Sequence, residues 1–113
     1  MFTKDESNYL RGLLILAAID QIITESERSF IRNTGKKLGF ESKFCTDSLE
    51  GILENKYIDR TIPVFNDNNI AKSFVQDCYI LALSDNNLCQ EEIFWLNIAA
   101  MKNNIPNISI KGD

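Results

Sequence analysis

Apolar residues recur at helical spacing in five separate stretches of the chain. In the first stretch, Tyr9, Leu10, Leu13, Leu14 and Ala17 share one helical face, and the remaining sides of its second half are apolar as well. A helix that is apolar all round lies at the centre of a domain. The pattern therefore predicts an all-α fold, a compact helical bundle of about five main helices. We expect these helices over residues 5–19, 25–38, 42–55, 70–84 and 90–103.

Several helix ends carry local signals. Thr3 with Glu6, and Thr24 with Glu27, have the spacing of a capping box, in which each side chain satisfies the free backbone N–H of the other residue. Gly39 follows the second helix, where a left-handed residue commonly ends a helix. These signals predict that the second helix begins after Thr24 and ends before Gly39.

Part of the sequence is repeated after 65 positions. Residues 13–40 align without a gap with residues 78–105, with six identities in 28 positions where about one or two are expected by chance. Each unit consists of an apolar helix, an acidic corner and a second helix. Two such αα-hairpins can pack around a pseudo-two-fold axis. The identical pairs are Ile15/Ile80, Leu16/Leu81, Ala17/Ala82, Asp20/Asp85, Glu27/Glu92 and Lys37/Lys102.

Length and composition limit the possible classes of function. We expect a single domain over residues 1–113, with residues 106–113 as a C-terminal tail. The net charge is −4 and no basic patch is visible, so nucleic acid is a poor candidate partner. The longest apolar run, residues 13–19, is too short to insert across a membrane. The N-terminus lacks the apolar core of a signal peptide, and the three cysteines form no disulfide pattern, which favours a cytoplasmic, bacterial protein.

The first corner reads apolar-Ala-x-x-Asp-x-x-Ile-Thr-x-x-Glu and is followed by a helix that ends at Leu-Gly-Phe. This pattern resembles the TerB-like family of tellurite-resistance proteins over about residues 10–105. The resemblance implies a compact helical bundle with an acidic corner in each half, and a role near stress or tellurite resistance. It also implies acidic positions that bind metal, here Asp20, Glu27, Asp85 and Glu92. Gln21 and Asn86 stand where the family commonly has glycine, which suits a left-handed conformation.

The acidic corners allow two interpretations. In the first, Glu27 caps a helix, and Asp20 and Asp85 bond backbone N–H groups of the following turn. In the second, the carboxylates bind a hard cation such as Ca²⁺ or Mg²⁺. The spacing of an EF-hand is absent, and a dinuclear carboxylate site would need histidine, which the chain lacks.

The fifth predicted helix has an apolar outer face. Ile93, Phe94, Ile98 and Met101 stand where the second helix has polar residues. Either Ile105, Ile108 and Ile110 cover this face, or it is an exposed patch that contacts a protein partner or forms a homodimer. Cys89, at the start of the same helix, either replaces a polar capping residue or is a reactive thiol whose pKa the helix terminus lowers.

No pattern typical of an enzyme is present. The chain has no histidine to activate a nucleophile and no phosphate-binding loop, GxGxxG motif or CxxC pair. We therefore expect a non-enzymatic cytoplasmic interaction or stress-response module. The alternative is a protein that binds or senses a divalent hard cation at the acidic corners.

Overall fold

The computed structural model describes residues 4–19, 21–54, 61–84 and 89–105. Within these ranges the chain forms five α-helices and no strand, which confirms the predicted all-α helical bundle. The helices are α1 (Lys4–Ala17), α2 (Glu25–Leu38), α3 (Ser42–Glu54), α4 (Asn68–Leu83) and α5 (Gln90–Lys102).

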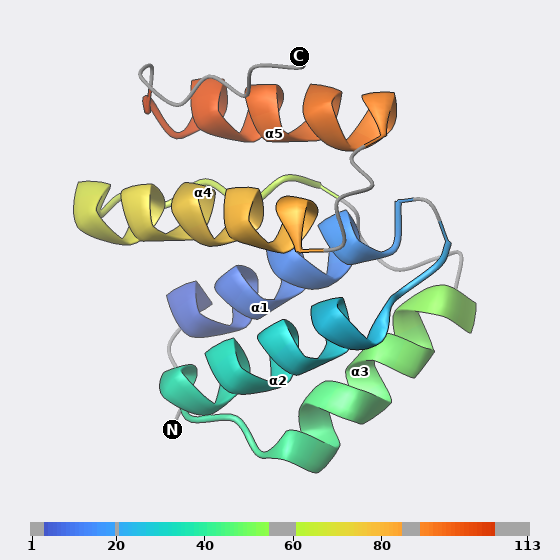
Figure 1. The fold of residues 1–113 in the computed structure, drawn as a ribbon. Coiled ribbons are helices and arrows are strands. Elements are labelled where there is room, and N and C mark those ends of the chain that lie inside the picture. The colour runs from blue at the N-terminus through green and yellow to red at the C-terminus, as the bar shows by residue number, and fades with distance from the viewer. Residues whose placement is uncertain (1–3, 20, 55–60, 85–88, 106–113) are drawn as a thin grey trace.

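Four helices lie side by side in the order α5, α4, α1, α2, and α3 crosses at the far side of α2 (Figure 1). α1 contacts α2, α3 and α4, whereas α5 packs on α4 at the edge of the bundle. The central place of α1 agrees with its apolar sequence, since Leu13, Ile15 and Leu16 are buried. The predicted end of this helix at Ile19 is wrong, because the helix stops at Ala17 and the next two residues form a turn.

Aromatic side chains connect the helices on both sides of α4. The ring of Phe74 on α4 lies 5.3 Å from that of Tyr9, 5.0 Å from that of Phe65 and 6.4 Å from that of Trp95. Tilted and edge-on ring pairs at such distances are favourable beyond the area that they bury. The cluster therefore joins α1, the segment before α4, α4 itself and α5 into one core.

Gly12 permits the close approach of α1 and α4. A Cβ atom at this position would overlap the ring of Phe74 and would also crowd Pro63. Gly51 on α3 has open space around it, so it is a helix-weakening residue without a packing reason. The two glycines show that only one of these positions requires the absence of a side chain.

The helix ends follow the local signals in the sequence. Thr24 and Glu27 form the predicted capping box of α2, and Gly39 ends this helix in the left-handed conformation with φ 102°. Asp67 caps α4 by accepting from the N–H groups of Asn69 and Ile70. The other expected box includes Thr3, which lies outside the described residues.

α2 and α5 end in closely similar ways. Gly39 and Asn104, which are 65 positions apart, both have positive φ, 102° and 59°. The next residue then returns a hydrogen bond to the last turn: Phe40 N–H to Gly35 at 2.8 Å, and Ile105 N–H to Ala100 at 2.9 Å. These features match the register of the sequence repeat, and the pseudo-two-fold relation of the two hairpins stays a prediction.

Candidate functional site

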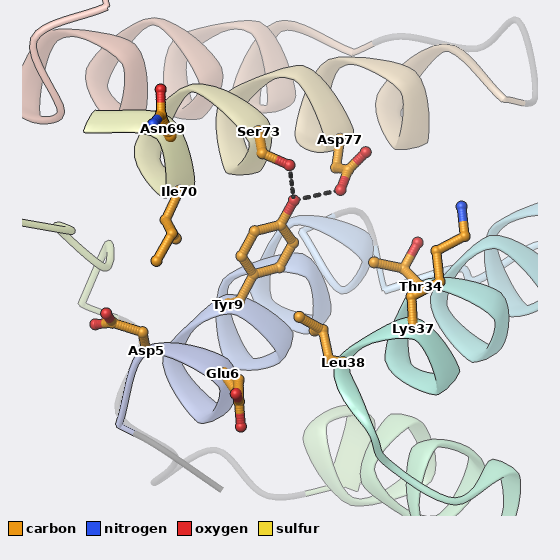
Figure 2. Close-up of a pocket in the computed structure, with 10 residues that line it drawn as sticks. All are labelled: Asp5, Glu6, Tyr9, Thr34, Lys37, Leu38, Asn69, Ile70, Ser73 and Asp77. Atoms are coloured by element: carbon orange, nitrogen blue, oxygen red, sulfur yellow. Dashed lines mark hydrogen bonds between the residues drawn. The ribbon is translucent and has the colours of Figure 1, made fainter. Parts of the chain in front are cut away.

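A cavity of about 630 Å³ lies between α1, α2 and α4, at the end of the bundle where α1 begins, α2 ends and α4 begins (Figure 2). Its size falls within the range of small-molecule sites in proteins. Its lining combines apolar walls with acidic, basic and hydroxyl groups. The lining residues are Asp5, Glu6, Tyr9, Thr34, Lys37, Leu38, Asn69, Ile70, Ser73 and Asp77.

Tyr9 is the central residue of this cavity. Its ring is buried on α1, and its hydroxyl points toward α4, where it donates to the Asp77 carboxylate and lies 2.9 Å from Ser73 Oγ (Figure 2). Burial, followed by the hydrogen bond to Asp77, raises the pKa of Tyr9 well above its usual value. The hydroxyl therefore stays protonated at neutral pH and acts as a hydrogen-bond donor, and it is a poor general base.

The ionisable groups of the cavity have different structural explanations. Asp5 and Glu6 lie in the first turn of α1, where the helix dipole favours negative charge. Asp77 lies far from both ends of α4, so no helix terminus accounts for its carboxylate. Lys37 lies in the last turn of α2, where a positive charge is favourable. Among these acidic residues, Asp77 is therefore the one whose position is not explained by a helix end.

No pattern in the sequence predicts this cavity. Tyr9 is predicted to lie on an apolar face, and Asp77, two residues after the core residue Val75 on α4, has no predicted role. Because the hydroxyl of a buried tyrosine usually has a hydrogen-bond partner, Tyr9 predicts that a polar group of another segment lies close to it. The partner could not be identified from the sequence, because Asp77 lies 68 positions from Tyr9.

The acidic corners are described only in part. Asp20 and Asp85 lie outside the described residues. Glu27 and Glu92 are buried, at 3% and 4% exposure, in corresponding places on α2 and α5. Glu27 Oε1 accepts from Thr24 N–H at 2.9 Å, which confirms the capping interpretation for Glu27, and Glu92 Oε1 accepts from the N–H of the residue three positions earlier at 3.3 Å.

Metal binding at these corners stays a prediction. Across residues 4–19, 21–54, 61–84 and 89–105, no group of three or more His, Cys, Asp or Glu side chains is placed to hold a metal ion. Glu27 and Glu92 are carboxylates of the kind that Ca²⁺ and Mg²⁺ prefer, and a third carboxylate ligand beside either of them would have to come from outside these ranges. Gln21 adopts the left-handed conformation with φ 64°, at the position where the TerB-like pattern has glycine.

The structure bears on the two interpretations of Cys89, a replaced capping residue or a reactive thiol. Cys89 precedes α5 as expected, but partial burial, followed by a hydrogen bond with Glu92, raises its pKa to about 11. The direction of this shift disfavours the interpretation as a reactive thiol, because burial and the neighbouring carboxylate both favour the protonated thiol. Cys45 and Cys78 are buried, and burial raises the pKa of both thiols as well.

The predicted apolar face of α5 is partly exposed. Phe94 and Met101 are 67% and 70% exposed, whereas Ile93 and Ile98 are half-buried. Beside Phe94 the surface has a shallow hollow, also lined by Trp95, whose buried indole N–H has no hydrogen-bond partner. The C-terminal tail, residues 106–113, lies outside the described residues.

Comparison with known proteins adds no relative: no family model, no curated protein and no solved structure matches the chain significantly. The TerB-like assignment therefore rests on the sequence pattern and stays a prediction. None of the helices in the described part of the chain is long and apolar enough to cross a membrane.

Proposed function

We propose that the chain is a non-enzymatic protein-interaction module that contacts its partner through the outer face of α5. The observation that carries this proposal is the exposure of Phe94 and Met101, which lie seven positions apart on the same side of the helix. Aromatic residues and methionine are enriched in the buried centres of protein interfaces. Because α5 lies at the edge of the bundle, a partner can approach this face without rearranging the core (Figure 1).

The chemistry of the cavity supports a binding role over a catalytic one. Tyr9 is held as a protonated donor, and the chain has no histidine to act as a base near neutral pH. The resemblance to TerB-like proteins supports a place in a cytoplasmic stress response. Loss of tellurite tolerance in a deletion strain, restored by the wild-type chain, would support that part of the proposal.

The interface proposal is tested by replacing both exposed residues, Phe94→Gln with Met101→Gln. Phe44→Gln is the matched control, because Phe44 is also an exposed aromatic residue, 50% accessible, and lies on α3 away from α5. Sedimentation measures self-association of the purified proteins, and cross-linking in cells followed by mass spectrometry identifies other partners. We expect the double variant, and not the control, to lose the contact.

Two results would contradict the proposal. One is a wild-type chain that is monomeric and cross-links to no protein through α5. The other is a double variant that keeps every contact of the wild type. Circular dichroism of each variant checks that the fold is intact, and surface positions of this kind usually change stability by less than about 0.5 kcal/mol.

The second candidate is binding of a divalent hard cation at the acidic corners. It is favoured by one observation, the burial of Glu27 and Glu92 in corresponding places. In this case Ca²⁺ or Mg²⁺ raises the melting temperature of the wild type, and Asp20→Asn combined with Asp85→Asn abolishes the rise. An equal rise in the double variant, or no rise in the wild type, would rule it out.

A further inference from the structure

The cavity around Tyr9 is separate from α5 and has its own chemistry. Its lining comes from α1, α2 and α4. We propose that this cavity binds a small organic amine. The ammonium group pairs with the Asp77 carboxylate, and the apolar body of the ligand lies against Leu38 and Ile70.

Size and shape favour a small molecule with an apolar part. A cavity of about 630 Å³ can accommodate a ligand with an aromatic ring or a short aliphatic chain. Leu38 and Ile70 lie on opposite sides of the Tyr9 ring, so they present apolar surface on both flanks of the polar centre (Figure 2). Burial of an apolar ligand body against these side chains supplies a favourable contribution that does not depend on charge.

The charges of the lining favour a cation. Among the described residues of the lining, the carboxylates of Asp5, Glu6 and Asp77 lie beside the ammonium group of Lys37. A concave surface with an excess of one sign concentrates ligands of the opposite sign. An amine places one positive charge among these groups, whereas a carboxylate ligand would meet a net repulsion.

The Tyr9 hydroxyl, which also contacts Ser73, orients the Asp77 carboxylate for such a ligand. The Tyr9 hydroxyl donates to Asp77 and lies 2.9 Å from Ser73 Oγ, so the carboxylate is held at the cavity before any ligand arrives. A group held in its binding orientation loses less conformational entropy on binding. Tyr9 is therefore a positioning residue, and Asp77 is the residue that contacts the ligand.

The test uses three probes of similar shape and different charge: phenethylamine, 2-phenylethanol and 3-phenylpropanoate. Each is titrated into the ¹⁵N-labelled full chain, and amide shifts are followed by NMR. We expect phenethylamine to shift the amides of residues around the cavity and to bind about tenfold more tightly than the alcohol, as loss of a charged hydrogen bond implies. The carboxylate should bind most weakly.

Two substitutions in the cavity give opposite predictions. Asp77→Asn keeps the shape and removes the charge, so phenethylamine should bind about tenfold more weakly. Lys37→Gln removes a like charge from an exposed position, so the amine should bind about twofold more tightly. Asp47→Asn is the matched control, because Asp47 is an exposed acid on α3 that pairs with Lys43 outside the cavity, and it should leave binding unchanged.

Several outcomes would overturn the proposal. They are equal binding of the amine and the alcohol, preference for the carboxylate, weaker amine binding in Lys37→Gln, or the absence of shifts around the cavity. Stronger binding of Nα-acetyl-lysine methylamide than of phenethylamine would point to a lysine side chain of another protein as the ligand. If Asp77→Asn fails to fold, Asp5→Asn, at the rim of the same cavity, provides the charge test, with a smaller weakening of about threefold expected.

Discussion

α2 and α5 have similar helix ends and different outer faces. Each has a buried glutamate in its first turn, and a residue with positive φ follows each helix: Gly39 directly after α2, and Asn104 one residue after Asn103, the cap residue of α5. On α2 the outer side chains form ion pairs, Arg28 with Glu50 at 2.9 Å and Arg32 with Glu25 at 3.1 Å. α5 instead exposes Phe94. The difference indicates that the helix ends follow requirements of folding, whereas the outer faces are free to follow function.

Corresponding positions of the two helices carry different side chains on the outer face. Phe94 and Met101 of α5 stand 65 positions after Ser29 and Lys36 of α2. The helix ends need particular residues because unsatisfied N–H and C=O groups recur at every terminus. No such requirement acts on the outer face, so a change from serine and lysine to phenylalanine and methionine there has little effect on the fold. Substitutions at matched positions of the two helices test this view.

The largest difference is expected where the helices end, at Leu38, the last residue of α2, and at the corresponding Asn103, the cap residue after α5. Asn103 is buried, and its side chain bonds Pro63 O at 3.0 Å, Ala99 O at 2.9 Å and Phe65 N–H at 2.9 Å. Asn103→Ala should lower the free energy of unfolding by about 2–4 kcal/mol, because it leaves a buried backbone N–H without its acceptor.

Leu38→Ala removes only half-buried apolar surface, and we expect a loss of about 1–2 kcal/mol. Urea unfolding followed by circular dichroism measures both variants. An equal decrease in the free energy of unfolding at the two positions would mean that the hydrogen bonds of Asn103 do not stabilise the contact between the segment before α4 and the end of α5.

A smaller difference is expected at the left-handed residues themselves. Gly39→Ala places a Cβ atom at φ 102° and should cost about 1–2 kcal/mol. Asn104→Gly, at φ 59°, should change stability by less than about 0.5 kcal/mol, because asparagine tolerates this region and glycine adopts it without strain. Thermal unfolding gives both values, and a neutral Gly39→Ala would show that the end of α2 rearranges.

The sequence predicted what local interactions determine. Thr24 and Glu27 interact within the first turn of α2, and Gly39 acts at its last turn. These local signals are therefore sufficient to predict both ends of the helix. The apolar pattern likewise identified α1 as the central helix. The predicted end of α1 is two residues too late, because Ala18 and Ile19 continue the apolar run although they form the turn after the helix.

The cavity depended on contacts between distant parts of the chain. Tyr9 meets Ser73 and Asp77 only because Gly12 lets α1 approach α4, and no sequence pattern links these four positions. The buried bonds of Asn103 are similar, since its partner Phe65 is 38 positions away. Periodicity reports which face of a helix is apolar, but it does not report which polar groups meet across two helices.

The smallest expected effect concerns the residues directly before the two helices, Thr24 before α2 and Cys89 before α5. The Cys89 pKa of about 11, against an ordinary value of 9.0, predicts slow alkylation by iodoacetamide until the pH approaches 11, since the thiolate is the reactive form. Between these two values the folded chain holds the proton that the unfolded chain releases. This contribution to stability is therefore complete below about pH 9 and is lost as the pH rises toward 11.

Mass spectrometry of the peptide that contains Cys89 measures the rate against pH, and the same chain unfolded in urea provides the reference. Glu92→Gln keeps an acceptor for the Cys89 N–H and removes the charge beside the thiol, so the midpoint should move down toward 9, the ordinary value. Glu54→Gln, at an exposed position on α3, should leave it unchanged. A midpoint below 9 in the wild type would mean that the helix terminus outweighs burial and Glu92 at this corner.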